Sequence, residues 1–316
     1  MIDLIDQWES WIMSDAFSPT LKQMRYLTTL YETHHFGKAA DLCHVTQSTL
    51  SAGIRELETL LGTQLVERTR RAVRFTPLGE RVVAKAVDIL REANTLVDIV
   101  QAAGNPLSST IKMGVIPTIA PFFLPQALPK LRKRFPKLKL YLREDLSQVV
   151  CSGLSRGELD VILLALPFAC GDVDQQVLFE DPFHAAFPEV AADHFPAKTI
   201  NASDLESEVL LLLEEGHCLK DHALAACQSA ALKADNSILG TSLHTLVQMV
   251  DNELGVTLLP QLAISGGILE GTNIQTKPLS GDAPTRKIGL VWRKDSPRVA
   301  EFKVLGEALK EFAPDM

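Results

Sequence analysis

Residues 44–62 read HVTQSTLSAGIRELETLLG, a stretch in which both ends of a helix can be recognised. Thr46 is of the residue type that caps a helix start, and Gly62 falls where a helix commonly ends. Between them the apolar side chains recur at helical spacing, at Leu50, Ile54, Leu57 and Leu61. A shorter helix is expected just before it, over 37–42, so the sequence predicts two short helices joined by a tight turn, a helix-turn-helix.

The polar face of the second helix and the basic residues after it are candidates for contact with DNA. Gln and Arg side chains can bond two atoms of an adenine or guanine edge, whereas Ser and Thr mainly contact the DNA backbone. The candidates on the helix are Gln47, Ser48, Thr49, Ser51 and Arg55. Arginines around a β-prone segment at 72–75 indicate a wing that lies against phosphates, with Arg70 and Arg71 as candidates. Such a basic stretch is a solvated surface as often as a phosphate contact.

A long helix is expected to begin at Thr76-Pro77, a capping residue followed by proline at the first helical position. Apolar residues then recur alternately four and three positions apart, which is typical of a coiled-coil seam. The seam predicts dimerisation through Val82, Ala86, Ile89, Ala93, Leu96 and Val100. The alternative is that this face packs on the helix's own domain.

Beyond a turn-forming stretch at 102–109, strand-like and helix-like segments alternate as far as residue 312. This alternation predicts an α/β architecture with a largely parallel sheet, large enough for two lobes with a cleft between them. The expected segments are 111–116, 121–135, 138–142, 147–155, 161–166, 209–213, 219–232, 243–251, 256–259, 287–292 and 298–312.

The charge is distributed unevenly along the 316 residues, although the net charge of −8 by itself argues against nucleic acid. Residues 18–91 carry eleven Lys or Arg and seven Asp or Glu, while residues 1–17 carry four acidic residues and no basic one. A basic module on an acidic body is the pattern of a DNA-binding segment attached to something else. The sequence shows neither a secretory signal nor an apolar run long enough to span a bilayer, so we expect a cytoplasmic protein.

The segment 216–227, GHCLKDHALAAC, holds two of the five cysteines, Cys218 and Cys227. A helix over 219–232 would hold their backbones about 13 Å apart. A disulfide needs Cα atoms within roughly 4.4–6.8 Å, so this bond could form only if the helix unwound, as in a redox switch. Two alternatives are inert core cysteines and a zinc site with His217 and His222, whose spacing matches no common zinc motif. The other three cysteines are interpreted as small buried apolar residues: Cys43, Cys151 and Cys170.

Residues 20–104 resemble the LysR-type transcriptional regulators. The phrases HFGKAA (35–40), TQSTLSAGIRELE (46–58) and FTPLGE (75–80) stand in that family's order and spacing. Within the family, four later segments resemble the peroxide-sensing OxyR subfamily: 114–125, 157–166, 211–227 and 286–297. Gly53 departs from the pattern, since relatives usually carry a longer polar side chain there, and this leaves the base preference open.

The resemblance implies an N-terminal all-α winged helix-turn-helix and a C-terminal α/β regulatory domain of two lobes, similar to periplasmic binding proteins. The implied boundaries are an extension at 1–17, the DNA-binding domain at 18–76, a linker helix at 77–104, a hinge at 105–110 and the regulatory domain at 111–316. Lobe I would comprise about 111–182 and 286–316, and lobe II about 183–285.

The resemblance also implies a peroxide site without metal or cofactor. Cys218 would be the peroxidatic cysteine and Cys227 its resolving partner. The pocket around them would be formed by Thr118, Ser147, His217 and Arg286. Reaction requires the thiolate, which a helix N-terminus and a permanently charged arginine would stabilise.

The implied function is a DNA-binding regulator of antioxidant genes, not an enzyme. Its partners would be double-stranded promoter DNA, hydrogen peroxide, RNA polymerase and further copies of itself in a homodimer or homotetramer, with no membrane. Alternatives are a regulator that responds to a small organic ligand in the inter-lobe cleft, a thiol peroxidase, and a solute-binding module.

Overall fold

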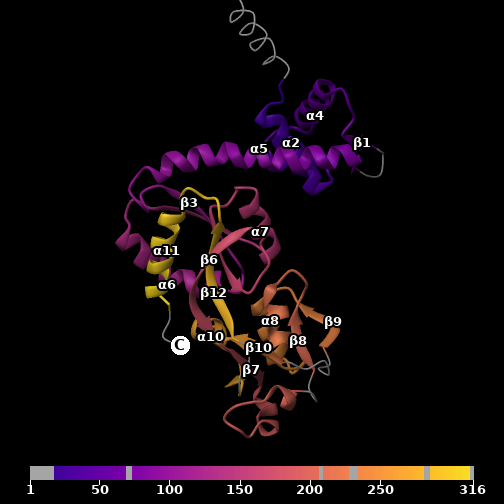
Figure 1. Ribbon diagram of the computed structural model, residues 1–316. Helices are drawn as coiled ribbons and strands as arrows, with labels where there is room; N and C mark the ends of the chain where they lie inside the picture. The colour runs from indigo at the N-terminus through magenta and orange to yellow at the C-terminus, as the bar shows by residue number, and fades with distance from the viewer. Residues whose placement is uncertain (1–17, 69–72, 206–208, 228–233, 281–284, 314–316) are drawn as a thin grey trace, which may run out of the picture. The chain divides into compact units, whose positions relative to one another are not determined.

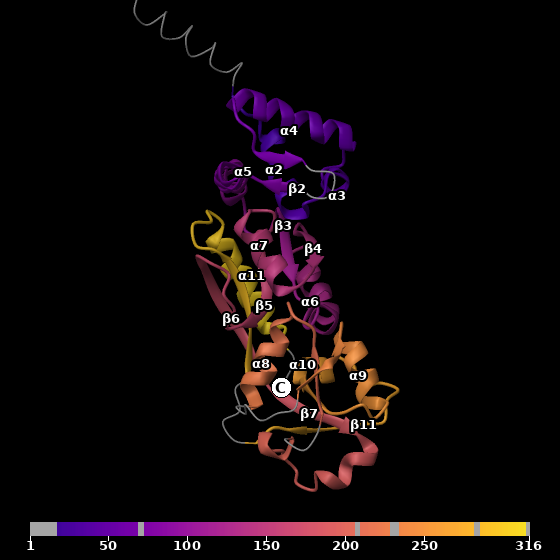
Figure 2. The same ribbon diagram turned by 90° about the vertical axis from the view of Figure 1, so that its right-hand side faces the viewer.

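The computed structural model describes residues 18–68, 73–205, 209–227, 234–280 and 285–313. The chain divides into two units, Met1–Val97 and Asp98–Met316, and each is described by itself (Figures 1 and 2). The predicted extension at 1–17 lies outside the described residues.

The first unit contains the predicted helix-turn-helix. Helix α2 (Leu21–Thr33) precedes α3 (Phe36–Leu42) and α4 (Gln47–Leu61), and a two-stranded antiparallel sheet of β1 (Val66–Arg68) and β2 (Val73–Phe75) follows. The Thr46 side chain accepts a hydrogen bond from the Thr49 backbone at 3.2 Å, and Gly62 ends α4 with φ of +65°. Both ends of α4 therefore lie where the sequence predicted them.

The long helix α5 (Pro77–Ala102) begins as predicted, because the Thr76 hydroxyl accepts a hydrogen bond from the Gly79 backbone at 2.9 Å. The core of the first unit is closed by fully buried side chains from α2, α4 and the segment before β1, among them Leu27, Leu30, Leu50, Ile54, Leu57 and Leu65. Among the helices that the structure describes, none is long and apolar enough to cross a membrane.

The second unit begins with a five-stranded sheet, in the order β4 (Lys139–Glu144), β3 (Thr110–Val115), β5 (Val161–Leu166), β12 (Arg286–Arg293) and β6 (Val173–Asp181). Helices α6 (Ala120–Arg134), α7 (Ser147–Ser155) and α11 (Val299–Glu311) pack with it, α7 against β3 and β5 and α11 against β6 and β12. We call this part lobe I.

The prediction of a largely parallel sheet is wrong for lobe I. Strand β3 is parallel to β4 and β5, but β12 runs antiparallel to both of its neighbours, β5 and β6. The physical reason is the chain path: β12 enters this sheet only after the chain has passed through a second sheet, and it arrives from the opposite end.

Lobe II contains this second sheet, in which β7 (Phe183–Pro188) lies between β10 (Thr257–Pro260) and β11 (Ile274–Pro278), antiparallel to both. Strands β8 (Leu210–Leu213) and β9 (Ala234–Gly240) form a parallel pair. The helices of this lobe are α8 (Cys218–Cys227), α9 (Leu243–Asp251) and α10 (Gln261–Ser265), with 3-10 helices at Glu189–His194 and Ala202–Leu205. Helix α8 begins one residue before the predicted helix, and the predicted continuation at 228–232 lies outside the described residues.

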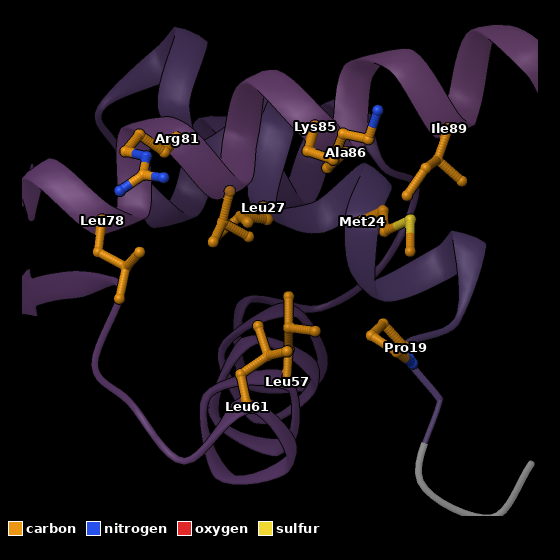
Figure 3. A pocket seen from close by; sticks show the side chains of 11 residues that line it. Pro19, Met24, Leu27, Leu57, Leu61, Leu78, Arg81, Lys85, Ala86 and Ile89 are labelled. Carbon is orange, nitrogen blue, oxygen red and sulfur yellow. The ribbon is translucent and has the colours of Figure 1, made fainter. Parts of the chain in front are cut away.

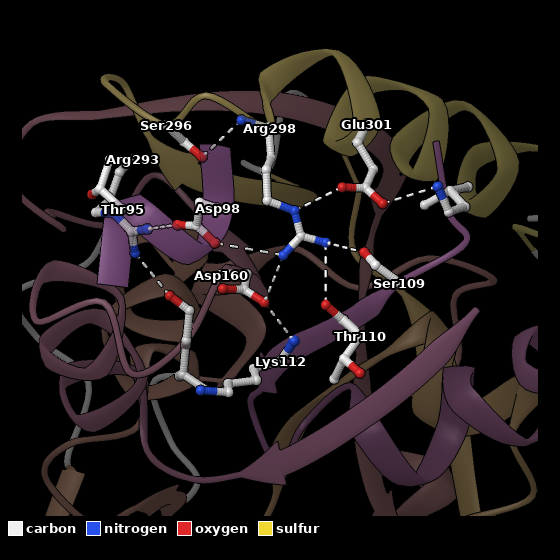
Figure 4. Close-up of polar contacts among 12 residues, drawn as sticks. Thr95, Asp98, Ser109, Thr110, Lys112, Asp160, Arg293, Ser296, Arg298 and Glu301 are labelled. Atoms are coloured by element: carbon white, nitrogen blue, oxygen red, sulfur yellow. Dashed lines mark hydrogen bonds and ion pairs between the residues drawn. The ribbon is translucent and has the colours of Figure 1, made fainter. Parts of the chain in front are cut away.

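A group of buried charged residues ties the end of α5 to lobe I (Figure 4). We call this group the arginine–carboxylate cluster, and its members are Asp98, Asp160, Arg293, Arg298 and Glu301, each less than 9 % exposed. Arg298 Nε donates to Glu301 at 2.7 Å and Nη1 to Asp160 at 3.3 Å, while Arg293 Nη2 donates to Asp98 at 3.2 Å. Burial, and then Asp160, raise the pKa of Asp98, and the two arginines oppose the shift.

Candidate functional site

The Cys218 thiol lies at the first residue of α8 and is surrounded by residues of lobe I. Only 2 % of Cys218 is exposed, and its sulfur is free. Three groups favour the ionised form of the thiol and so lower its pKa. They are the Ser147 hydroxyl at the start of α7, Arg286 at the start of β12 and the Ala165 backbone in β5. The structure thus brings together the predicted Cys218, Ser147 and Arg286 from elements far apart in sequence.

The Ser147 hydroxyl is buried without a satisfied hydrogen bond. The residue is 1 % exposed, and Oγ has no partner of ordinary hydrogen-bond geometry among the described residues. The hydroxyl nevertheless interacts with the Cys218 thiol closely enough to lower its pKa. Buried polar groups are normally paired, so a hydroxyl left open beside a thiol suits a small polar molecule.

Arg286 is held in place by two different elements. Its Nε donates to Asp181 Oδ2 at 2.8 Å, and Nη1 donates to the Thr118 hydroxyl at 3.0 Å. Nη2 donates to the Thr118 carbonyl at 3.1 Å and lies 2.7 Å from Asp181 Oδ2. Thr118 is itself 2 % exposed, and its hydroxyl accepts from the arginine while its own proton can still be donated.

Asp181 is a site residue that the sequence reasoning missed. It is fully buried at the end of β6, and its Oδ1 accepts a hydrogen bond from the Leu262 backbone at 2.8 Å. Its carboxylate therefore neutralises Arg286 and also ties lobe I to α10 of lobe II. The available signal was an acidic residue directly before Pro182, where the chain passes between the lobes.

The expectation that Cys218 is an activated thiolate stays a prediction, because groups around the thiol act on its pKa in opposite directions. Burial raises the pKa of the thiol, and the opposing effects of Ser147, Arg286 and the Ala165 backbone are smaller. Asp221 adds to the increase. Desolvation of the thiolate is the largest of these effects and outweighs the positive field of Arg286.

The reactivity of Cys218 is therefore expected to rise steeply with pH above neutrality. Because only the thiolate reacts and the folded pKa is raised, the rate of alkylation by iodoacetamide should increase about tenfold per pH unit until the pKa is reached. Peptide mapping of the folded chain at several pH values measures this rate, with urea-unfolded chain as the reference that levels off at lower pH. A rate independent of pH between 6 and 8 would show that the thiolate is already formed.

Two histidines lie near Cys218 in the sequence, His217 directly before it and His222 four residues after it on α8. His217 is 7 % exposed, and burial lowers its pKa against the effects of Glu214 and the Thr241 backbone, so the ring is neutral at pH 7. His222 Nε2 lies 3.0 Å from the Pro167 carbonyl, which can only accept, so Nε2 carries the proton. Burial lowers the pKa of His222 as well. In the sequence His222 had been considered only for a zinc site.

Cys227 is the last residue of α8, and the predicted helix between it and Cys218 is confirmed. The two cysteines are the first and last of the ten residues of α8, so their backbones lie about 13 Å apart. The side chain of Cys227 lies outside the described part of the chain. Within that part, no group of three or more His, Cys, Asp or Glu side chains could hold a metal ion.

The interpretation of Cys151 and Cys170 as plain core residues is wrong, because they form a disulfide. Their Cα atoms are 5.2 Å apart, although 19 positions separate them in sequence. Cys151 lies on α7, and Cys170 lies in the segment after β5. The fold brings these two segments together, and neither residue's sequence neighbourhood indicates the pairing.

On α4 the predicted DNA contacts lie on the outer face. Gln47, Ser48, Thr49 and Arg55 are exposed and Ser51 is half-buried, with Arg55 Nη2 donating to the Ser51 hydroxyl at 3.1 Å. The predicted wing contacts Arg70 and Arg71 lie outside the described residues. The α4 set is thus accessible to a partner, and its role in DNA binding stays a prediction.

Gly53 does not belong to this outer face. It is buried in α4, and a Cβ at this position would lie 2.8 Å from a ring carbon of Tyr26. Glycine at this position therefore allows α2 and α4 to approach each other, and its effect on base preference stays an open question.

Replacing Gly53 by alanine is expected to destabilise the first unit by about 1–3 kcal/mol, because the added methyl overpacks the contact with Tyr26. Helix propensity alone predicts the opposite sign, a gain of about 1 kcal/mol. Urea unfolding of the full chain, followed by circular dichroism, measures the change. At the neighbouring exposed position, Ala52→Gly is the matched control, where alanine should be the more stable residue; a stabilising Gly53→Ala would refute the packing argument.

The predicted seam on α5 divides into two parts. Val82, Ala86 and Ile89 line an apolar cavity of about 500 Å³ with residues of α2 and α4, and Arg81 and Lys85 also line it (Figure 3). The further seam residues are half-buried or exposed, with Leu96 at 67 % and Val100 at 75 %. The first part of the seam, from Val82 to Ile89, thus also faces its own domain, as the alternative hypothesis predicts. The role of the seam in dimerisation stays a prediction.

Comparison with known proteins covers nearly the whole chain. Residues 21–80 match the family model of the bacterial regulatory helix-turn-helix proteins of the lysR family, and residues 104–314 match that of the LysR substrate binding domain. The chain is 43 % identical over 299 residues to the HTH-type transcriptional regulator EstR of Acinetobacter baylyi, covering 93 % of this chain and 97 % of the relative.

Two further similarities concern regulators named OxyR. The chain is 39 % identical over 292 residues to the DNA-binding transcriptional dual regulator OxyR of Escherichia coli, covering 92 % and 94 % of the two chains. A solved structure of a full-length OxyR variant from Pseudomonas aeruginosa matches with a TM-score of 0.68 at 36 % identity, covering 92 % of this chain and 94 % of that one.

Proposed function

The chain belongs to the LysR family of DNA-binding transcriptional regulators, and from this premise we propose that it senses hydrogen peroxide through Cys218. The observation that carries the proposal is the free, buried Cys218 thiol beside the unsatisfied Ser147 hydroxyl and the fixed Arg286–Thr118 pair. The similarity to regulators named OxyR supports it.

The proposed reaction has two steps. The Cys218 thiolate attacks one oxygen of hydrogen peroxide, which breaks the O–O bond, forms a sulfenic acid and releases hydroxide. Cys227 then attacks the sulfenic sulfur, so that a disulfide forms and water leaves. Donors around the pocket, Arg286 and the Thr118 and Ser147 hydroxyls, would hold the peroxide and stabilise the departing oxygen.

The disulfide cannot form while α8 is intact, because the helix holds the two backbones about 13 Å apart. Formation of the bond therefore requires α8 to unwind, and the free energy of peroxide reduction would drive that change. We propose that the change alters contacts between copies of the chain, in a homodimer or homotetramer, and so its binding to promoter DNA and its action on RNA polymerase in the cytoplasm.

Peptide-mapped mass spectrometry tests the proposal. Reduced protein is mixed with one equivalent of hydrogen peroxide and quenched over seconds. A Cys218–Cys227 disulfide is expected to appear rapidly in the wild type, to be absent in Cys218→Ser, and to form at the wild-type rate in Cys43→Ser, which removes a thiol of the other unit. Persistently free Cys218 would refute peroxide sensing.

A second candidate is a regulator whose signal is a small organic ligand in the cleft between the lobes. The observation that favours it is the raised pKa of a nearly inaccessible Cys218, since buried cysteines with raised pKa are typically inert. Unchanged promoter binding after peroxide treatment, in both wild type and Cys218→Ser, would favour this candidate. We propose no enzymatic activity; sustained peroxide turnover with a thiol reductant would contradict that.

A further inference from the structure

Among the described residues, the second unit holds one free cysteine and one bonded pair of cysteines. Cys218 is a free thiol, while Cys151 and Cys170 are joined in a disulfide. The Cα atoms of Cys151 and Cys170 are 5.2 Å apart, within the range that a disulfide requires. The proposed function uses neither Cys151 nor Cys170.

Cys151 lies one helical turn after Ser147 on α7, so the two side chains share a face of that helix. Ser147 is the residue whose hydroxyl interacts with the Cys218 thiol. The Cys151–Cys170 bond is thus attached to the same helix face that forms one wall of the thiol site. Cys151 is 7 % exposed, whereas Cys170 is half-buried and the more accessible sulfur.

The other end of the bond lies in the segment that follows β5, a strand that also contributes to the thiol site. Cys170 follows β5 by four residues, and the Ala165 backbone in β5 interacts with the Cys218 thiol. In the same segment the Pro167 carbonyl accepts the hydrogen bond from His222 of α8 at 3.0 Å. The segment from Pro167 to Cys170 is therefore fixed at two points, to α8 by His222 and to α7 by the disulfide.

We propose that Cys151–Cys170 is a second redox couple, which a low-molecular-weight thiol opens and which controls access to Cys218. A small thiolate attacks the accessible Cys170 sulfur, the S–S bond breaks, and Cys151 leaves and takes up a proton. A second small thiolate then releases Cys170 as a thiol, so that two small thiols become one small disulfide. With the bond open, α7 and the segment after β5 are no longer joined, and Cys218 becomes accessible more often.

The equilibrium is measured on the full chain, without peroxide, across a series of reduced-to-oxidised glutathione ratios under anaerobic conditions. Free thiols are first alkylated in denaturant with light iodoacetamide. The cysteines that were oxidised are then reduced and alkylated with isotopically heavy iodoacetamide. Cys151 and Cys170 are expected to change label together in one two-electron transition, while Cys218 and Cys43 stay light. The proposal is overturned if Cys151 and Cys170 are free thiols, with light label, at every ratio, or bonded, with heavy label, at every ratio. It is also overturned if Cys218 changes label at the same ratio as the pair.

The effect on Cys218 is measured by brief alkylation of the folded protein. Because a nearly inaccessible thiol reacts only when its surroundings open, opening the bond should raise the rate at Cys218 on the order of tenfold. The variant Cys151→Ala with Cys170→Ser should show the raised rate at every glutathione ratio, and Cys43→Ser should behave as wild type. Equal rates in the open and closed states overturn the claim. Neither readout uses peroxide, so failure of the proposed sensing reaction would not be mistaken for failure of this inference.

Discussion

Replacing Arg298 by methionine is expected to lower the free energy of unfolding of the second unit by about 3–5 kcal/mol. Arg298 is 1 % exposed and donates to Glu301 and Asp160, as well as to the Thr110 carbonyl at 3.2 Å. Methionine fills most of the volume of the arginine side chain, but it leaves the buried carboxylates of Glu301 and Asp160 without this positive partner. An uncompensated buried charge costs far more than the ion pair contributes.

Differential scanning calorimetry and urea unfolding of the full chain measure this loss. At roughly 2–4 °C per kcal/mol for a unit of this size, the melting temperature should fall by about 6–20 °C. The matched control is Arg134→Met, because Arg134 pairs with Glu311 at 45 % and 58 % side-chain exposure. Exposed pairs contribute about 0–1 kcal/mol, so two variants of equal stability would refute the role assigned to the arginine–carboxylate cluster.

Replacing Asp181 by asparagine is expected to change stability and reactivity in opposite directions. The variant loses the charge that neutralises Arg286, at a cost of about 3–5 kcal/mol for a broken buried pair, although asparagine can still accept from Leu262. The freed positive charge of Arg286 then favours the Cys218 thiolate. The alkylation rate of Cys218 at neutral pH should therefore increase about tenfold.

Local unfolding of the destabilised variant could also raise the alkylation rate of Cys218. The variant Arg298→Met distinguishes local unfolding from the electrostatic effect, because it should destabilise the same unit while leaving the charges around Cys218 unchanged. An increase confined to Asp181→Asn, with the pH dependence of alkylation shifted to lower pH, supports the electrostatic explanation. Equal increases in both variants would contradict it.

The sequence predicts local structure well where single residues mark it. Thr46, Gly62 and Thr76 fix helix ends through their own hydrogen bonds or backbone conformation, and each prediction is confirmed. Strand β6, by contrast, was missed, because its polar residues at 174–176 interrupt any apolar alternation. The direction of β12 depends on the chain path through lobe II, which no local pattern encodes.

The candidate site shows the same division. The structure places Ser147 and Arg286 beside Cys218, as the resemblance implies. The resemblance did not include Asp181 or His222, whose roles arise from contacts between segments far apart in the sequence. The thiol's raised pKa likewise depends on burial in the fold, which outweighs the opposing effects of Ser147 and Arg286. The Cys151–Cys170 pairing required the fold, since spacing of cysteines does not determine connectivity.

The position of β12 between β5 and β6 has a consequence for biosynthesis. Strand β6 ends at Asp181, and the strand that joins it to the sheet begins only at Arg286. At bacterial elongation rates the ribosome needs roughly 5–20 s to make the intervening segment. During that interval β5 and β6 expose unpaired edges, which are templates for aggregation. Yield of the native protein should therefore depend on how quickly the codons of residues 182–285 are translated and on chaperones that shield β5 and β6 in the meantime.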